Sequence, residues 1–194
     1  MNDTPRSLLE RLRHQPDEAS WKRLVDLYTP LLRRWLRKSG VKSSDADDLM
    51  QEVFAVLLRK LPSFEHNQQR GSFRRWLHTI LLNHLRAFWN IRQTIPETAD
   101  SSQLLQQLDH LQDPASDLNQ LWEREHDAFL ARRVLELIEN DFTPTTWQAF
   151  RRVVLDGAKP AEVAAELGMS VNAVHLAKWR ILRRARQEIT GLID

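Results

Sequence analysis

The segment PAEVAAELGMSVNAVHLAKW, from Pro160 to Trp179, carries the most specific local pattern in the chain. A helix-turn-helix needs a small residue where its two helices touch, a turn residue that tolerates positive φ, and apolar residues that fix the helix crossing. Ala164 and Gly168 meet the first two requirements. The apolar positions are Val163, Leu167, Val174 and Ala177. The segment therefore predicts a helix-turn-helix with its turn at Gly168.

The second helix of this pair has the composition of a nucleic-acid recognition helix. Ser170 is a natural N-cap, and the basic run RRAR, residues 183–186, follows on the same helix. Polar side chains near the start of such a helix can contact base edges, whereas arginines bind phosphates. The candidate DNA-binding residues are Ser170, Asn172, His175, Lys178, Trp179, Arg180 and Arg183. Two short packed helices also occur in proteins that never touch nucleic acid, so the motif alone leaves that alternative open.

Apolar residues recur at helical spacing through most of the remaining chain, and no stretch has the pattern of a β-strand. Capping residues and prolines predict the helix starts at Thr4-Pro5, Asp17, Ser44, Ser72 and Thr143-Pro144. A further helix is expected from Leu118 to Ile138. We therefore expect an all-α fold of two small domains. The first is a helical bundle in residues 1–93, and the second is the helix-turn-helix domain in residues 118–194.

Residues 94–117 differ from both predicted domains, because they are rich in Gln, Asp and Ser and contain two prolines. This composition predicts a flexible linker. Between Glu97 and Asp127, eight acidic residues accompany a single basic one, Arg124, so this region carries a net charge of −7 and the rest of the chain +9. An acidic linker between two basic segments could avoid DNA or occupy a basic channel in a partner.

The segment RGSFRRWLHTILLNHLRAFWN, Arg70 to Asn90, mixes aromatic with basic residues. Aromatic rings can stack on unpaired bases while arginines neutralise the phosphates of the strand. The candidates in this segment and the preceding loop are Phe64, Arg70, Arg74, Arg75, His78, Asn83, Arg86 and Trp89. We expect Phe73 and Trp76 to pack in the core, and Trp89 and the loop residue Phe64 to be exposed.

The segment DADDLMQEVF, Asp45 to Phe54, brings three carboxylates together at a predicted helix start. Asp45, Asp47 and Asp48 could ligate a magnesium ion in a nuclease-like site. Capping and the helix dipole explain the same charges without a metal, and no partner histidine or lysine-rich catalytic motif accompanies them. We therefore predict no metal site and no catalytic residue.

Composition excludes several other classes of protein. The 194 residues are 42% hydrophobic and 28% charged, which is ordinary for a globular chain. There is no cysteine for a disulfide framework or a thiol nucleophile, and the five glycines form no phosphate-binding loop. The N-terminal stretch lacks the apolar centre of a signal peptide, and no run approaches the roughly 18 apolar residues of a membrane span. We expect a cytoplasmic protein without membrane insertion, cofactor or small-molecule substrate.

Two of these motifs, in this order, resemble the bacterial sigma-70 family of RNA polymerase sigma factors. DADDLMQEVF followed by FEHNQQRGSFRRWLHTILLN is similar to region 2 of that family, in its compact extracytoplasmic-function (ECF) branch. The helix-turn-helix continued by HLAKWRILRRAR resembles region 4. The resemblance covers most of the chain outside the linker.

The resemblance implies a transcription initiation factor, not an enzyme, that works in the bacterial cytoplasm. Region 2 would bind core RNA polymerase through Asp48, Leu49, Gln51, Glu52 and Phe54, and would recognise and melt the minus-10 promoter element through residues 64–89. Region 4 would read the duplex minus-35 element through the recognition helix. The implied partners are core RNA polymerase, promoter DNA in duplex and melted form, and an anti-sigma factor or another regulator.

Two rival functions remain at the level of sequence. A stand-alone helix-turn-helix regulator would use the N-terminal bundle to sense a ligand or to dimerise, and would bind paired half-sites without polymerase. A metal-dependent nuclease would use the Asp45 cluster to cleave DNA. Dependence on polymerase distinguishes the proposed initiation factor from both.

Overall fold

The computed structural model describes residues 7–64, 72–93 and 117–192, and all regular structure in these ranges is helical. The α-helices are α1 (Leu8–His14), α2 (Glu18–Lys38), α3 (Ser43–Lys60), α4 (Ser72–Gln93), α6 (Asp117–Ile138), α7 (Pro144–Val154), α8 (Pro160–Leu167) and α9 (Val171–Ile189). Short 3-10 turns, η1 (Leu61–Ser63) and η2 (Glu139–Asp141), follow α3 and α6. The predicted all-α fold is confirmed. None of the described helices is long and apolar enough to cross a lipid bilayer.

Side-chain caps start several of these helices where the sequence predicts them. Asp17 accepts a hydrogen bond from the Ser20 amide at 2.7 Å, and Thr143 accepts one from the Thr146 amide at 3.3 Å. Each bond satisfies an amide that has no partner inside its helix. The predicted starts of α2 and α7 are therefore confirmed.

The start of α3 differs from the prediction. The helix begins at Ser43, its N-cap is Lys42, and no side chain caps it. The expected cap at Ser44 is wrong, because Ser44 already lies inside the first turn. The predicted start at Thr4-Pro5 falls outside the described residues. Within them, α1 begins at Leu8 after a capping box formed by Ser7 and Glu10.

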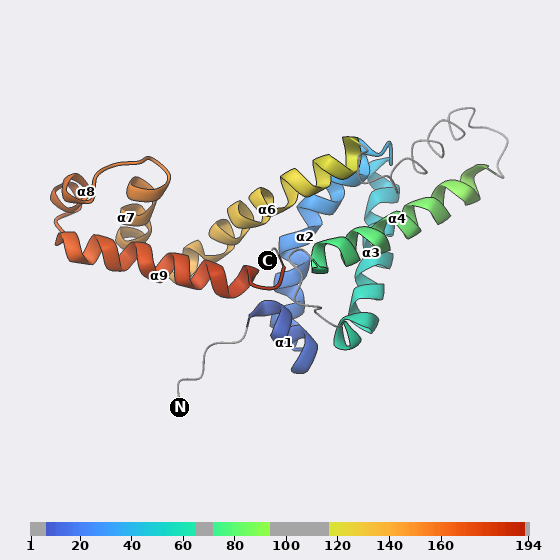
Figure 1. Ribbon diagram of the computed structural model, residues 1–194, viewed down its shortest axis with the longest axis horizontal. Helices are drawn as coiled ribbons and strands as arrows, with labels where there is room; N and C mark the ends of the chain where they lie inside the picture. Colours follow the sequence, from blue (N-terminus) through green and yellow to red (C-terminus); the bar gives the residue numbers. More distant parts are fainter. Residues whose placement is uncertain (1–6, 65–71, 94–116, 193–194) are drawn as a thin grey trace.

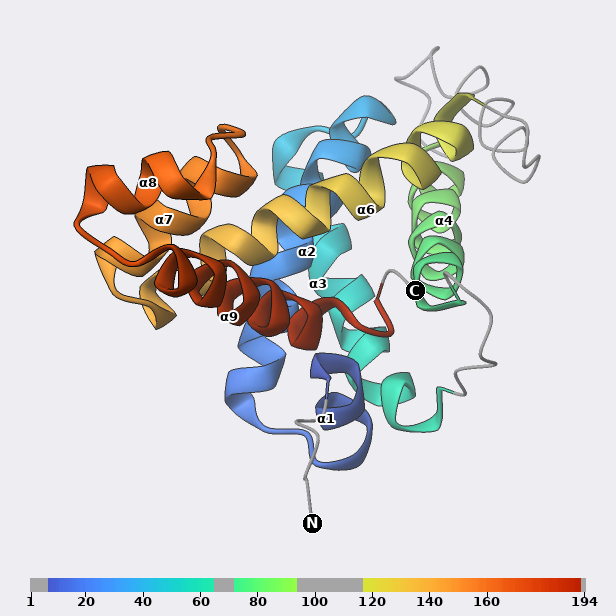
Figure 2. The same ribbon diagram turned by 60° about the vertical axis from the view of Figure 1, so that its left-hand side comes forward.

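Two apolar clusters organise the described part of the chain. The larger one takes buried residues from α1, α2, α3, α4, α6 and the second half of α9, together with Phe150 of α7. The smaller one joins α7, α8 and the first half of α9 through Ala149, Val163, Ala164, Val174 and Ala177. The α7–α8 pair lies at the far end of the molecule from α4 (Figures 1 and 2).

Helix α6 connects the two parts of the fold. It runs along α2 and also packs on α9 (Figure 1). Its buried residues are Trp122, His126, Leu130, Val134 and Ile138. A residue every four positions advances 400° around a helix, so the buried stripe drifts by 40° at each step and turns through 160° from Trp122 to Ile138. This drift lets the two ends of α6 face different neighbours.

The division into a domain of residues 1–93, a linker of 94–117 and a domain of 118–194 stays a prediction. The linker lies outside the described residues except for Asp117, the first residue of α6. In the structure, α6 and the second half of α9 pack directly on α1 and α2.

The helix-turn-helix forms as the sequence predicts. Gly168 ends α8 with φ of +62°, and Ser170 caps α9 by accepting a hydrogen bond from the Ala173 amide at 3.1 Å. A left-handed φ costs little for glycine and more for residues that carry a Cβ. This turn sets the crossing of α8 and α9 over Val163 and Val174.

Replacing Gly168 by alanine should therefore lower the free energy of unfolding by about 1 kcal/mol. Nothing lies within 4 Å of the added Cβ, so the penalty comes from the backbone alone. Gly168→Asn should recover part of the loss, because asparagine tolerates the left-handed region. Urea unfolding of the three proteins measures both effects. An alanine variant as stable as the wild type would contradict this account of the turn.

Candidate nucleic-acid interface

The first half of α9 presents an exposed polar and basic face. All seven predicted recognition residues, from Ser170 to Arg183, are exposed. No acidic residue lies between Ser170 and Gln187 to oppose a phosphate. Asn172 and His175 stand near the start of the helix, where side chains can reach base edges in a major groove. The arrangement suits duplex DNA.

Trp179 lies on the same face. Its side chain is 55% exposed, and the guanidinium carbon of Arg183 lies 5.1 Å from the centre of its ring. This cation–π contact holds two of the predicted residues together on the surface.

The exposed side of α9, which we call its recognition face, also carries apolar side chains that are not among the predicted residues. Val171, Leu176 and Leu182 are exposed on α9. They were detectable in principle, because they fall outside the 174, 177, 181, 185 series that α9 buries. Exposed apolar groups on such a helix can contact the methyl group of thymine.

The predicted residues of α4 divide into exposed and buried groups. Arg75 and Asn83 lie with Thr79 on one exposed stripe, four residues apart. Arg86 is half-buried, and Arg70 lies outside the described residues. The stripe offers cationic and hydrogen-bonding groups along the outside of α4.

Two aromatic residues expected to be exposed are buried instead. Phe64 is 9% exposed and stacks on Trp76 with ring centres 4.6 Å apart, and Trp89 is 7% exposed. The expectation of exposure is therefore wrong for both. Phe64 comes after η1 at the end of α3, and its ring also lies nearly perpendicular to the ring of Phe73 in the core. Phe73 is buried and Trp76 half-buried, as expected.

Two further predicted residues of α4 face α6. Arg74 Nη1 donates a hydrogen bond to Asp127 Oδ1 at 2.9 Å. The His78 ring stacks on Trp122 with ring centres 5.0 Å apart and is 7% exposed. In this arrangement neither side chain presents its polar atoms to a nucleic acid.

Asp127 belongs to a chain of polar contacts that runs from Tyr28 of α2 through His126 and Asp127 of α6 to Arg74 of α4. The Tyr28 hydroxyl lies 3.3 Å from His126 Nε2, and His126 Nδ1 lies 2.9 Å from Asp127 Oδ1. A neutral His126 with its proton on Nδ1 donates to the carboxylate and accepts from the tyrosine. Partial burial alone would raise the pKa of Asp127, but the hydrogen bonds from His126 and Arg74 hold that pKa below its ordinary value. Burial raises the pKa of the Tyr28 hydroxyl.

The predicted polymerase-binding residues of α3 are partly accessible. Asp48, Gln51 and Glu52 are exposed, whereas Leu49 is buried and Phe54 half-buried. The spacing of the three polar residues places them on one side of the helix, next to the exposed Leu58. We call this side of α3, which carries Asp48, Gln51, Glu52 and Leu58, the α3 face. It can take part in a protein contact.

The alternative metal site at the start of α3 gains no support. Asp47 forms an ion pair with Arg33 at 2.7 Å. Among the described residues there is no group of three or more side chains of the kind that hold a metal ion.

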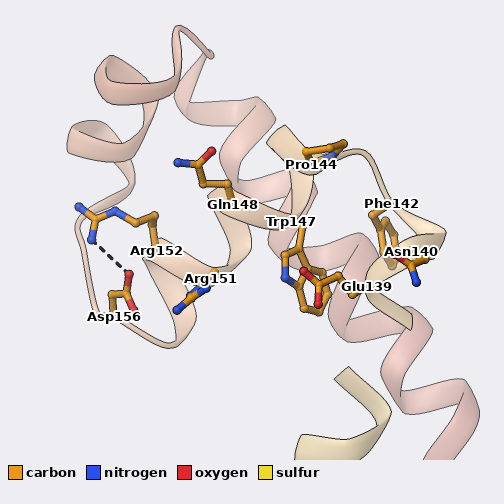
Figure 3. A pocket seen from close by; sticks show the side chains of 9 residues that line it. All are labelled: Glu139, Asn140, Phe142, Pro144, Trp147, Gln148, Arg151, Arg152 and Asp156. Atoms are coloured by element: carbon orange, nitrogen blue, oxygen red, sulfur yellow. Dashed lines mark hydrogen bonds and ion pairs between the residues drawn. The ribbon is translucent and has the colours of Figure 1, made fainter. Parts of the chain in front are cut away.

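A separate hollow of about 490 Å³ lies beside α7 (Figure 3). Trp147 and Phe142 lie toward one end of it, and Arg152 is paired with Asp156 toward the other (Figure 3). The lining contains two carboxylates, Glu139 and Asp156, and the second of these is the partner of Arg152.

The buried His78 makes stability depend on pH. Burial, with a smaller effect of His126, lowers the pKa of His78 from 6.5 to about 4. Between these two pH values the unfolded chain binds a proton that the folded chain does not. The contribution of His78 to stability is therefore complete above about pH 6.5 and is lost as the pH decreases toward 4. From pH 7 to pH 5 this one group should cost about 2 kcal/mol of unfolding free energy.

Urea unfolding at both pH values tests this expectation. His78→Phe keeps a ring against Trp122 and removes the titrating group, so the pH-dependent loss should shrink by that amount. His14→Gln, at an exposed position, is the control. An unchanged pH dependence in His78→Phe would contradict the burial of a neutral histidine.

Comparison with known proteins assigns the N-terminal helices. The family described as Sigma-70 region 2 matches residues 24–93. The chain is 31% identical to the ECF RNA polymerase sigma factor RpoE of Cereibacter sphaeroides over 77 residues. These residues make up 40% of this chain and 41% of that protein. Over 85 residues it is 33% identical to the RNA polymerase sigma factor NccH of Alcaligenes xylosoxydans xylosoxydans, 44% of each.

The chain thus spans less than half the length of these two curated relatives. The matched residues begin within α2 and end with α4, so they include the α3 face and the exposed stripe of α4. Residues 24–93 therefore match a sigma-70 region 2 domain, and over this part the chain is similar to the ECF sigma factors.

Proposed function

We propose that this protein is a transcription initiation factor that binds core RNA polymerase and directs it to specific promoters. The observation that carries the proposal is the combination of a region 2 domain with a helix-turn-helix whose recognition face is wholly exposed. The first is typical of proteins that work with polymerase, and the second of proteins that read duplex DNA. No catalytic group is needed for this function.

The α3 face supplies the contact with polymerase in this proposal. Asp48 and Gln51 offer a carboxylate and an amide to a partner, with Leu58 as an apolar neighbour. Glu52 adds a second exposed carboxylate, one oxygen of which lies 2.9 Å from His84 Nδ1 of α4. Charged and polar groups around an apolar centre are ordinary for a protein interface. Leu49 and Phe54 contribute by holding α3 in place, because they pack inward.

The two DNA elements fall to different helices. The exposed stripe of α4, with Arg75 and Asn83, acts on the minus-10 element, where a strand must be held in melted form. The first half of α9 reads the minus-35 element as duplex, with Asn172 and His175 toward the bases and Arg180 and Arg183 toward phosphates. An anti-sigma factor or another regulator that covers these surfaces is a further partner of this function.

The α3 face provides the direct test. Asp48→Ala/Gln51→Ala/Glu52→Ala should abolish co-purification with bacterial core RNA polymerase while the helical content stays unchanged, because all three side chains are exposed. Glu136→Ala/Glu162→Ala removes the same charge from exposed positions outside α3 and should co-purify normally.

Two outcomes would refute the proposal. If the wild type does not associate with core polymerase and binds duplex DNA as a dimer, the stand-alone regulator is correct instead. If the triple variant associates as well as the wild type, α3 is not the polymerase contact.

A further inference from the structure

Exposed apolar side chains lie among the polar residues at the start of α9. Val171 and Leu176 are each 43% exposed, and both belong to the first two turns of the helix. Asn172 and His175 are exposed on the same turns. A helix turns by about 100° per residue, so these four side chains leave the axis within about 140° of one another. The recognition face therefore begins with a mixture of apolar and polar groups.

The fold of the helix-turn-helix does not use these two apolar side chains. In the part of the chain that the structure describes, neither Val171 nor Leu176 belongs to either apolar cluster. The buried contacts of α9 in this region come from Val174 and Ala177. Apolar surface is unfavourable in water, and burial against a partner removes that cost. Val171 and Leu176 are therefore available to a partner.

The charges around these side chains favour duplex DNA as that partner. Lys178, Arg180 and Arg183 are exposed on the same helix. No acidic residue lies between Ser170 and Gln187. A helix in the major groove has phosphates on both sides, which suits this charge pattern. The apolar group that DNA presents in the same groove is the C5 methyl group of thymine.

The polar side chains at the same level favour adenine beside such a methyl group. The amide of Asn172 can bond to both N6 and N7 of adenine, and His175 can donate to N7 of either purine. Guanine is read most often by arginine or lysine. The first of these along α9 is Lys178, about 10 Å along the axis from Val171. The first two turns therefore suit A·T pairs better than G·C pairs.

The spacing of the two apolar side chains suits neighbouring base pairs. Leu176 lies five residues after Val171, which is about 8 Å along the helix axis. Base pairs repeat about every 3.4 Å, so the two side chains can meet methyl groups about two base pairs apart. Leu182 lies about 9 Å beyond Leu176, past the N-terminal part of a recognition helix that contacts base edges.

We propose that α9 recognises its duplex through the C5 methyl groups of thymine, with Val171 and Leu176 as specificity-determining residues and Asn172 reading a nearby adenine. This inference rests on the proposed function, because it names the bases that the contact with the minus-35 element selects. Discrimination in the first two turns of α9 then depends on methyl groups and not on hydrogen bonds from arginine to guanine.

Deoxyuridine tests the proposal, because it lacks only the methyl group of thymine and keeps the O4 acceptor. The complex of this protein with core RNA polymerase first selects a bound duplex from a random pool. Each thymine of the selected element is then replaced by deoxyuridine. Replacement at one or two positions should weaken binding about fourfold each, as expected when one methyl group is removed from an apolar contact. Equal binding of all the substituted duplexes would overturn the proposal.

A variant of α9 links the methyl group to one side chain. Leu176→Ala should bind the thymine and deoxyuridine duplexes equally at one of these positions, because the side chain that meets the methyl group is missing. Its helical content should not change, since the position is exposed and alanine favours helix. The control is Leu155→Ala, because Leu155 is 58% exposed and caps the end of α7, outside α9.

The control should keep the fourfold difference at every sensitive position. The proposal is wrong if Leu176→Ala retains the difference at all of them, or if Leu155→Ala loses it as Leu176→Ala does. It is also wrong if Leu176→Ala weakens only the association with core polymerase, because the apolar side chains then belong to a protein contact.

The same measurements on the chain without polymerase separate this inference from the proposed function. If core polymerase does not bind the chain, but the chain alone selects a duplex with methyl-dependent affinity, the proposed function fails and the inference stands. If the polymerase complex forms and selects a duplex without methyl dependence, only the inference fails. If neither the chain nor its polymerase complex selects a duplex, α9 does not read DNA and the inference fails.

Discussion

Burial of Trp122 and His126 against α2 and α4 is the interaction on which the arrangement of this molecule depends. These two side chains bring the C-terminal helices onto the region 2 domain and join both into one apolar cluster. The drift of the buried stripe along α6 then turns its other end toward α9. Since the first half of α9 belongs to the helix-turn-helix, the position of this motif in the molecule follows from how α6 packs.

The sequence predicts the parts of this fold that local chemistry determines. Gly168 predicts the turn of the helix-turn-helix, and Ser170 predicts the cap of its second helix. Asp17 and Thr143 predict two further helix starts. These predictions succeed because each residue acts on backbone groups only a few positions away. The docking of α6 is different. Its buried residues form no fixed apolar face, and two of the partners of Trp122, Trp35 and His78, are distant in sequence. The predicted exposure of Phe64 and Trp89 is wrong for a related reason. A position in a loop or at a helix end does not determine which distant side chains will cover it.

The same contrast applies to the candidate site. The exposed face of α9 could be predicted, because a capped helix with regular apolar spacing fixes which side is free. Arg74 and His78 were predicted from composition alone, and in the structure they face the acidic helix α6 instead of solvent. The end of the acidic stretch thus forms ion pairs with the N-terminal helices, because Glu125 binds Arg34 and Asp127 binds Arg74. A basic surface and an acidic helix that covers part of it occur in one chain.

Transcription in a purified system tests the central claim most directly. Core bacterial RNA polymerase is supplied with this protein and with genomic DNA fragments, and the start sites of the transcripts are mapped. The account predicts transcripts from defined sites that core polymerase alone does not use, each preceded by related sequences about 10 and 35 base pairs upstream. Transcripts that start at the same places with and without the protein would contradict it.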